Sequence, residues 1–266
     1  MADHYNGYGL KHFAATIAEC MELPVPESYA PSISWAADIL KARMGGAADR
    51  VVLYHADAVG MFIWQKYTNR FAPVYQNTSL AIPFCSTIES YTPVAHASMY
   101  TGLKPKDHGI QANVKPVLTV PTLFDAAIQS GHRPIIISTE GDSISKIFLE
   151  RNMDYIICAT PDECNAKAEQ VLEADQHDLI TVYNGNYDAV MHRYGPEAED
   201  ALAQLRHNGQ AFEKLSAIAK KVWAGKPGMA AFLPDHGCHE IDGQLGSHGL
   251  DMAEDMNIIH FYQFYG

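Results

Sequence analysis

Short apolar runs alternate with longer amphipathic stretches along this chain, and that order constrains its fold more than any other feature. Arg50–His55, Arg133–Ser138 and Asp178–Tyr183 have strand length and are rich in Val, Ile and Tyr. Residues 161–174 and 197–223 have helical apolar spacing and lie between such runs. The alternation predicts an α/β fold, with a mainly parallel sheet sandwiched between helices.

Further elements follow the same rule. Apolar runs predict strands at Asp154–Cys158, Met229–Leu233 and Ile258–Phe264, and Thr122–Ser130 is expected to be a helix that Gly131 closes. A chain of 266 residues that is 47% hydrophobic can bury the core of one domain. We therefore expect a single domain over 1–266, with a helical amino-terminal extension over 1–45.

Composition excludes several classes of protein. A formal charge of −12 disfavours a nucleic-acid polymer as the main partner, because such binding uses clustered Lys and Arg. The amino terminus has no basic region before an apolar one, and no run of about 18 apolar residues occurs, so neither a signal peptide nor a membrane span is expected. The five cysteines form no C-x-x-C pair, which favours a cytoplasmic protein without a disulfide framework.

Acids and histidines follow the carboxyl ends of several predicted strands, where ligand sites of open α/β sheets lie. They are Asp57, Asp188, His192, Asp235, His236 and His248. Carboxylate and imidazole ligands together suit zinc or manganese. The spacing of four lets Asp188 and His192 reach one ion, whereas Asp235 and His236 can share an ion only if the chain bends, as Gly237 permits.

The segment from Thr92 to Gly102 predicts a short helix with both ends marked. Thr92 is expected to be the N-cap, Pro93 the first helical residue, and Gly102 the residue that closes the helix. A phosphate bound there would meet free backbone N–H groups and the positive end of the helix dipole. A hydroxyl at that point becomes a nucleophile when a metal ion coordinates it.

These motifs, in this order, resemble the alkaline phosphatase superfamily over roughly residues 50–250, and most of all its nucleotide pyrophosphatase/phosphodiesterase branch. The matching stretches are the strand ending in Asp57, Thr92–Gly102 with Pro105–Ile110, Tyr183–His192 with Tyr194–Pro196, Pro234–Gly237, and Ser247–Gly249. Any one of these motifs alone would be a weak indication, but together they are specific.

The resemblance implies a hydrolase of small phosphate esters that works with two divalent ions, zinc or manganese. Thr92 would be the nucleophile and would form a phosphothreonine intermediate. The resemblance assigns seven ligands, with one ion held by Asp57, Thr92, Asp235 and His236, and the other by Asp188, His192 and His248.

This sequence departs from the pattern of the branch in two respects. Ala95 stands where members often carry an Asn that contacts phosphate, and Asn184 and Asn186 are the candidates to replace it from the neighbouring strand end. The chain is also too short for the long insertion that shapes substrate pockets in many relatives.

Other functions and roles stay open at this point. A phosphomutase or phosphonate hydrolase uses the same machinery, and Ala95 would also suit a degenerate module that binds metal and phosphate. A sulfatase is disfavoured because Cys85 lacks the C-x-P-x-R context. We expect His96 and His108 to be structural. His239 and Glu240 either orient a ligand histidine or lie in a surface loop.

Overall fold

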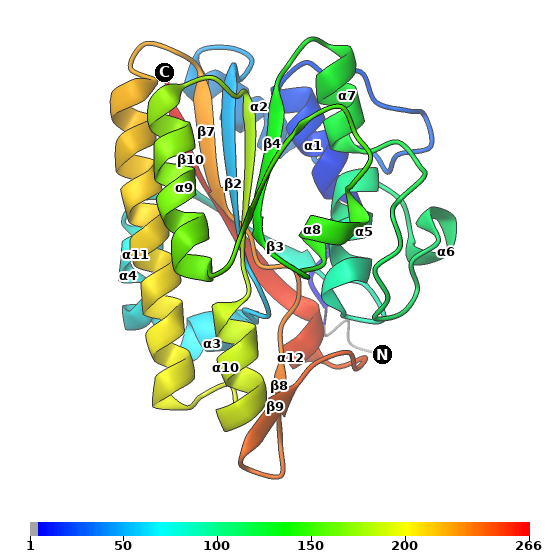
Figure 1. The fold of residues 1–266 in the computed structure, drawn as a ribbon, viewed down its shortest axis with the longest axis vertical. Coiled ribbons are helices and arrows are strands. Elements are labelled where there is room, and N and C mark those ends of the chain that lie inside the picture. The colour runs from blue at the N-terminus through cyan, green and yellow to red at the C-terminus, as the bar shows by residue number, and fades with distance from the viewer. Residues whose placement is uncertain (1–4) are drawn as a thin grey trace.

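Alternate side chains of strand β2 (Arg50–Ala56) enter two different hydrophobic cores. Val51 and Leu53 belong to one core, and Val52 and Tyr54 belong to the other. Because successive side chains of a strand point to opposite faces, this strand must be covered by helices on both sides. The computed structural model describes residues 5–266 and shows this arrangement, a sheet between two helical layers (Figure 1).

The central sheet has eight strands in the order β1-β3-β10-β7-β2-β6-β4-β5. Their bounds are Tyr8–Gly9 for β1, Leu80–Cys85 for β3, Asn257–Tyr265 for β10, Gly228–Phe232 for β7, Leu179–Asn184 for β6, Pro134–Thr139 for β4 and Asp154–Cys158 for β5. Strand β10 runs antiparallel to its neighbours β3 and β7, and the other pairs are parallel. The predicted fold class, a mainly parallel sheet between helices, is confirmed.

Each helical layer packs on one face of this sheet. The first layer contains α1 (Phe13–Cys20), α2 (Ser34–Met44), α5 (Thr92–Thr101), α7 (Leu123–Gln129) and α8 (Ile144–Ile147). The second layer contains α3 (Met61–Lys66), α4 (Ala72–Tyr75), α9 (Pro161–Ala174), α10 (Asn186–Tyr194) and α11 (Glu199–Val222). Figure 1 shows α9 and α11 on one side of the sheet and α1, α5 and α7 on the other.

Local signals explain why several helices begin where they do. Thr122 caps α7, and Asp125 completes a reciprocal capping box with it. Thr160 caps α9, whose first residue, Pro161, has no N–H that would need a partner. The predicted helices near 122–130 and 161–174 are therefore confirmed, with their ends shifted by a residue at most.

Some elements were not predicted from the sequence. Strand β3 is half-buried and contains Pro83, a residue that weakens a strand pattern because it cannot donate to the ladder. The amino-terminal segment predicted to be helical also contains the short strand β1, which pairs with β3. Its helix α1 enters the core, where Phe13 packs edge-on against Tyr100 and His260.

A two-stranded hairpin of β8 (His239–Ile241) and β9 (Leu245–Ser247) lies outside the main sheet. Its turn contains Asp242 and Gly243, both with positive φ, as the predicted turn at this pair requires. Figure 1 shows the hairpin projecting from the end of the molecule where α3 and α10 follow strands β2 and β6. None of the described helices combines the length and apolarity needed to cross a bilayer.

Candidate metal centre

The order of the strands brings together side chains that are far apart in the sequence. Strands β7, β2 and β6 are neighbours in the sheet and run parallel. Asp57 follows β2, Asp188 lies on α10 just after β6, and Asp235 follows β7. Because the carboxyl ends of parallel strands meet at one edge, the three carboxylates gather there.

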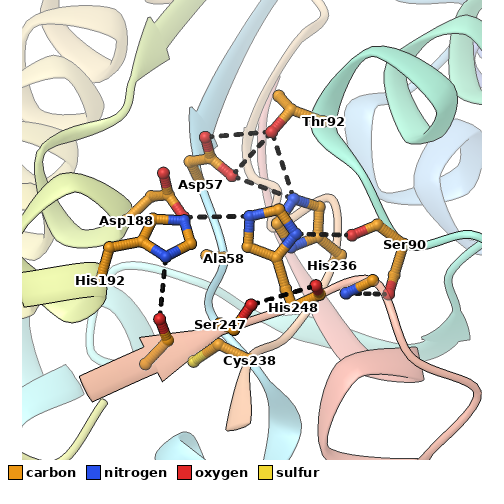
Figure 2. Close-up of polar contacts among 12 residues, drawn as sticks. Asp57, Ala58, Ser90, Thr92, Asp188, His192, His236, Cys238, Ser247 and His248 are labelled. Atoms are coloured by element: carbon orange, nitrogen blue, oxygen red, sulfur yellow. Dashed lines mark hydrogen bonds and ion pairs between the residues drawn. The ribbon is translucent and has the colours of Figure 1, made fainter. Parts of the chain in front are cut away.

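The first group of side chains consists of Asp57, Asp235 and His236, which are all buried. His236 Nε2 lies 3.3 Å from Asp57 Oδ1 and 3.5 Å from Asp235 Oδ2. The hydroxyl of Thr92 reaches this group from the start of α5. Its oxygen lies 3.4 Å from both carboxylate oxygens of Asp57 and 3.2 Å from His236 Nε2 (Figure 2).

The second group consists of Asp188, His192 and His248, which are partly exposed. Asp188 Oδ1 lies 3.2 Å from His192 Nε2 and 3.5 Å from His248 Nε2. Asp188 and His192 share one face of helix α10, as their spacing of four predicts. The rings of His236 and His248 stack, so the two groups adjoin. In each group, the potential ligand atoms lie within 4.8 Å of one another.

The buried carboxylates of the first group have pKa values shifted in opposite directions. Burial alone would raise the pKa of Asp57, but the charge of His236 and a hydrogen bond from Tyr183 outweigh burial and lower it. Burial and the negative charge of Asp57 raise the pKa of Asp235 well above its usual value. Two carboxylates this close repel each other, and a cation between them would relieve that repulsion.

The histidines of the second group also differ. A hydrogen bond with Asp188 raises the pKa of His192 to about 9, although burial opposes this shift. Burial lowers the pKa of His248 to about 3, and the charge of His236 adds to the effect. His248 is therefore a neutral imidazole at physiological pH, the form that binds metals.

The donor set and an unpaired oxygen fit metal ions. Among the described residues, Asp235 Oδ2 is a buried oxygen that accepts no hydrogen bond. A buried carboxylate oxygen without a donor is costly unless another positive group faces it. Both groups offer carboxylate oxygens and imidazole nitrogens, which zinc and manganese accept. The residues present therefore fit one cation in each group.

Helix α5 begins one residue earlier than predicted. Tyr91 is the extended residue before the helix, and Thr92 is its first helical residue rather than its N-cap. The hydroxyl of Thr92 is directed to Asp57 and His236, so it does not cap the helix as the sequence predicted. Gly102 closes the helix in the left-handed conformation, as predicted.

Solved structures of other proteins resemble this fold, although no sequence comparison finds a relative. No protein-family model and no curated protein sequence matches the chain. Among solved structures, the periplasmic domain of the phosphoethanolamine transferase EptC from Campylobacter jejuni superimposes with a TM-score of 0.59 and 10% identity, over 82% of this chain and 80% of that one. The murine ectonucleotide pyrophosphatase/phosphodiesterase 5, solved as an inactive variant with AMP, gives 0.56 and 15%.

A third similar structure is phosphonoacetate hydrolase from Sinorhizobium meliloti, with a TM-score of 0.53 and 16% identity over 74% of this chain. These three proteins belong to the alkaline phosphatase superfamily. The chain has an alkaline phosphatase-like fold. The resemblance inferred from the motifs is thus confirmed at the level of the fold. The matched region spans 58% of the murine phosphodiesterase and 59% of the phosphonoacetate hydrolase.

Within this alkaline phosphatase-like fold, two residues at the centre had no role assigned from the sequence. The Tyr183 hydroxyl donates a hydrogen bond to Asp57 Oδ2. The carbonyl oxygen of Ser90 accepts a hydrogen bond from His248 Nδ1 at 2.9 Å. Tyr183 ends the predicted strand Asp178–Tyr183 and is the last residue but one of β6, a position where ligand-site residues gather, whereas Ser90 has no such signal in the sequence.

The position of Ala95 contributes no polar group to the centre. Its side chain is fully buried in the core of the first helical layer. The suggested substitutes are engaged elsewhere, since Asn184 Nδ2 lies 3.5 Å from Asn165 Oδ1 and Asn186 Nδ2 donates to Gln204 Oε1 at 2.9 Å. These partners lie on α9 and α11, and the Nδ2 groups of both asparagines are directed toward them.

The two histidines predicted to be structural are buried and hydrogen-bonded. His96 Nδ1 lies 2.9 Å from the carbonyl oxygen of Thr92, and its Nε2 lies 3.3 Å from His55 Nδ1. His108 Nε2 lies 2.9 Å from the hydroxyl of Ser98. His96 thus contacts the first turn of its own helix, α5, and its Nδ1 also lies 3.4 Å from Asp235 Oδ2.

Proposed function

We propose that this protein is a phosphoric ester hydrolase that works with two divalent ions, zinc or manganese, and uses Thr92 as its nucleophile. The observation that carries the proposal is the location of the Thr92 hydroxyl. It lies against Asp57 and His236, at the start of a ten-residue helix and beside the second group of ligands. The alkaline phosphatase-like fold supports the proposal, because it is found in a phosphodiesterase, a phosphotransferase and a phosphonate hydrolase.

We assign the ions to the residues that the resemblance implied. Asp57, Asp235, His236 and the Thr92 hydroxyl would hold one ion, and Asp188, His192 and His248 would hold the second. When bound, such ions lower the pKa of a coordinated hydroxyl and stabilise the attacking and leaving oxygens. The amino-terminal end of α5 presents the positive end of its dipole to a phosphate.

The chemistry then runs as two displacements at phosphorus. The Thr92 oxygen gives its proton to solvent and attacks the phosphorus atom, and the ester oxygen on the opposite side leaves with its electron pair and takes up a proton from solvent. The products are a phosphorylated Thr92 and a free alcohol. Water then attacks the phosphorus atom and returns a proton to the Thr92 oxygen, which releases phosphate from a monoester substrate or a phosphate monoester from a diester. In this scheme Asp57 orients the hydroxyl, and Tyr183 holds Asp57 in place.

The proposal is tested with chelated protein to which zinc or manganese is returned. Hydrolysis of nitrophenyl phosphate, as monoester and as diester, should appear only with the metal. Thr92→Ala should keep the metal and lose turnover by about three orders of magnitude or more. Thr101→Ser is the matched control, because Thr101 lies on the same helix but bonds the carbonyl of Ala97. Turnover that survives chelation, or an unchanged rate in Thr92→Ala, would refute the proposal.

Product analysis separates the alternatives. A phosphate group retained in an isomerised product would indicate a phosphomutase, and phosphate released from a carbon-bonded substrate would indicate a phosphonate hydrolase. Phosphate binding without phosphothreonine at Thr92 would identify a degenerate binding module. The phosphothreonine itself is detected by acid quench and mass spectrometry of the peptide that contains Thr92.

A further inference from the structure

A buried carboxylate outside both ligand groups connects the segments that carry their histidines. Asp255 lies in the short helix α12 (Ala253–Met256), and its side chain is fully buried. Its Oδ1 accepts a hydrogen bond from His239 Nδ1 at 2.8 Å. Its Oδ2 accepts one from the backbone N–H of Leu250, also at 2.8 Å. One carboxylate therefore holds two points of the chain that are eleven residues apart.

The backbone of Asp255 also holds a third residue, Gly237. The carbonyl oxygen of Asp255 accepts a hydrogen bond from the N–H of Gly237 at 2.7 Å. At Gly237 a side chain would not fit, because a Cβ atom there would lie 1.9 Å from the carbonyl oxygen of Glu254. Helix α12 thus packs directly against the residue that follows His236, and it ties both ends of segment 237–250 together.

The ends of this segment adjoin one ligand from each group. His236 immediately precedes Gly237, and His248 lies two residues before Leu250. Ser90 holds His248 from the other side, through its carbonyl oxygen to His248 Nδ1 and through its hydroxyl oxygen to the N–H of Gly249 at 3.1 Å (Figure 2). With Nδ1 occupied, His248 turns Nε2 toward Asp188. The orientation of His248 therefore depends on the anchoring of the segment around it.

We propose that Asp255 is a positioning residue that holds His236 and His248 in place for metal binding, acting through Gly237, His239 and Leu250. This inference rests on the proposed function for the presence of the ions, but its geometry does not depend on any ester. It also gives His239 the orienting role that the sequence left undecided, whereas Glu240 is exposed. Residues that hydrogen-bond metal ligands directly typically contribute 10- to 100-fold to metal affinity or activity, and this range is the upper limit for Asp255, which acts through the neighbours of the ligands.

The test compares Asp255→Ala and Asp255→Asn with Glu254→Gln, a neighbouring exposed acid that serves as the matched control. Zinc affinity is measured by calorimetry on chelated protein, and hydrogen exchange is measured over residues 237–250. Asp255→Ala should bind zinc more weakly, by up to about 10- to 100-fold, and exchange faster over this segment. Asp255→Asn keeps an acceptor for Leu250 and should fall between Asp255→Ala and the wild type. Glu254→Gln should match the wild type.

Asp255→Ala removes the acceptors of two polar groups, His239 Nδ1 and the N–H of Leu250, so a folded variant with a smaller change is also needed. His239→Ala removes one hydrogen bond of Asp255, and we expect a zinc affinity a few-fold lower, with faster exchange confined to the start of the hairpin. Wild-type affinity and wild-type exchange in either variant would overturn the inference.

The two proposals fail in different ways. A wild-type protein that binds two ions and cleaves no phosphate ester would refute the hydrolase and leave the role of Asp255 intact. A wild-type protein that binds no ion would refute the hydrolase and the metal role of Asp255 together. Normal metal-dependent hydrolysis with unaltered zinc binding in Asp255→Ala would refute only the inference about Asp255.

Discussion

The imidazole rings of His236 and His248 stack with their centroids 4.2 Å apart and 29° between their planes, although each ring belongs to a different ligand group. The two proposed ion sites therefore adjoin each other, with the stacked rings of His236 and His248 between them. A change in one ring alters the space available to the other. Counting the bound ions in variants of single ligands therefore tests whether the two groups hold separate ions.

We expect His248→Ala to reduce the number of tightly bound zinc ions from two to one. The first group, with Asp57, Asp235 and His236, remains complete in this variant, whereas the second loses one of its three ligands. Ion content after gel filtration, measured by mass spectrometry, gives the stoichiometry. His207→Ala is the control, because His207 is an exposed residue paired with Asp162 on the helical layer. Two ions in His248→Ala would contradict the assignment.

Tyr183→Phe is expected to weaken zinc binding at the first site by about 10- to 100-fold. The hydroxyl of Tyr183 donates to Asp57 and helps to lower the pKa of that carboxyl, so its loss raises this pKa and frees the carboxylate to rotate. Tyr54→Phe is the matched control, since Tyr54 is equally buried but bonds Asn165 on the opposite face of the sheet. Equal zinc affinities in the two variants would show that Tyr183 has no special role.

Gly237→Ala should destabilise the fold by about 2 kcal/mol or more, because the new methyl group would force α12 away from the end of β7. The added Cβ would meet the Glu254 carbonyl oxygen and also lie 2.9 Å from Gly60 Cα. Chemical denaturation measures the loss in free energy of unfolding. Gly7→Ala is the control, because nothing lies within 4 Å of a Cβ at that position. A wild-type midpoint in Gly237→Ala would contradict this packing argument.

The stability contributed by Asp175 should vanish in acid. Burial alone would raise the pKa of this carboxyl, but hydrogen bonds from Lys226 and Arg50 outweigh burial and lower it. A carboxyl with a lowered folded-state pKa stabilises the fold above its unfolded pKa of about 3.9, and the contribution is lost as the pH falls through the folded value.

The variant Asp175→Asn measures this contribution. Asp175 has a φ of 48°, a conformation that Asn tolerates, so the substitution removes the charge without straining the backbone. We expect a deficit of about 1 kcal/mol in the free energy of unfolding between pH 5 and 8. Denaturation series at several pH values should show the deficit shrinking below pH 4. A deficit that is constant down to pH 2.5 would exclude the ion pair as its cause.

Local sequence signals predicted most of the fold. The apolar runs identified β2, β4, β5, β6, β7 and β10, because strands of a sheet covered by helices on both sides consist largely of consecutive apolar residues. Capping residues such as Thr122 and Thr160 determined where helices begin. The half-buried strand β3 was missed because its pattern is weak and includes Pro83, and the start of α5 was misplaced by one residue.

The sequence by itself determined which residues are suited to bind metal and which hydroxyl is suited to attack phosphorus, since residue type and short spacing decide those properties. Only the tertiary structure decided how they are held. The hydrogen bonds of Tyr183 to Asp57, of His248 to Ser90 and of His239 to Asp255 link parts of the chain that no local pattern connects. Their physical cause is the order and direction of the strands, which bring the ends of β7, β2 and β6 to one edge of the sheet.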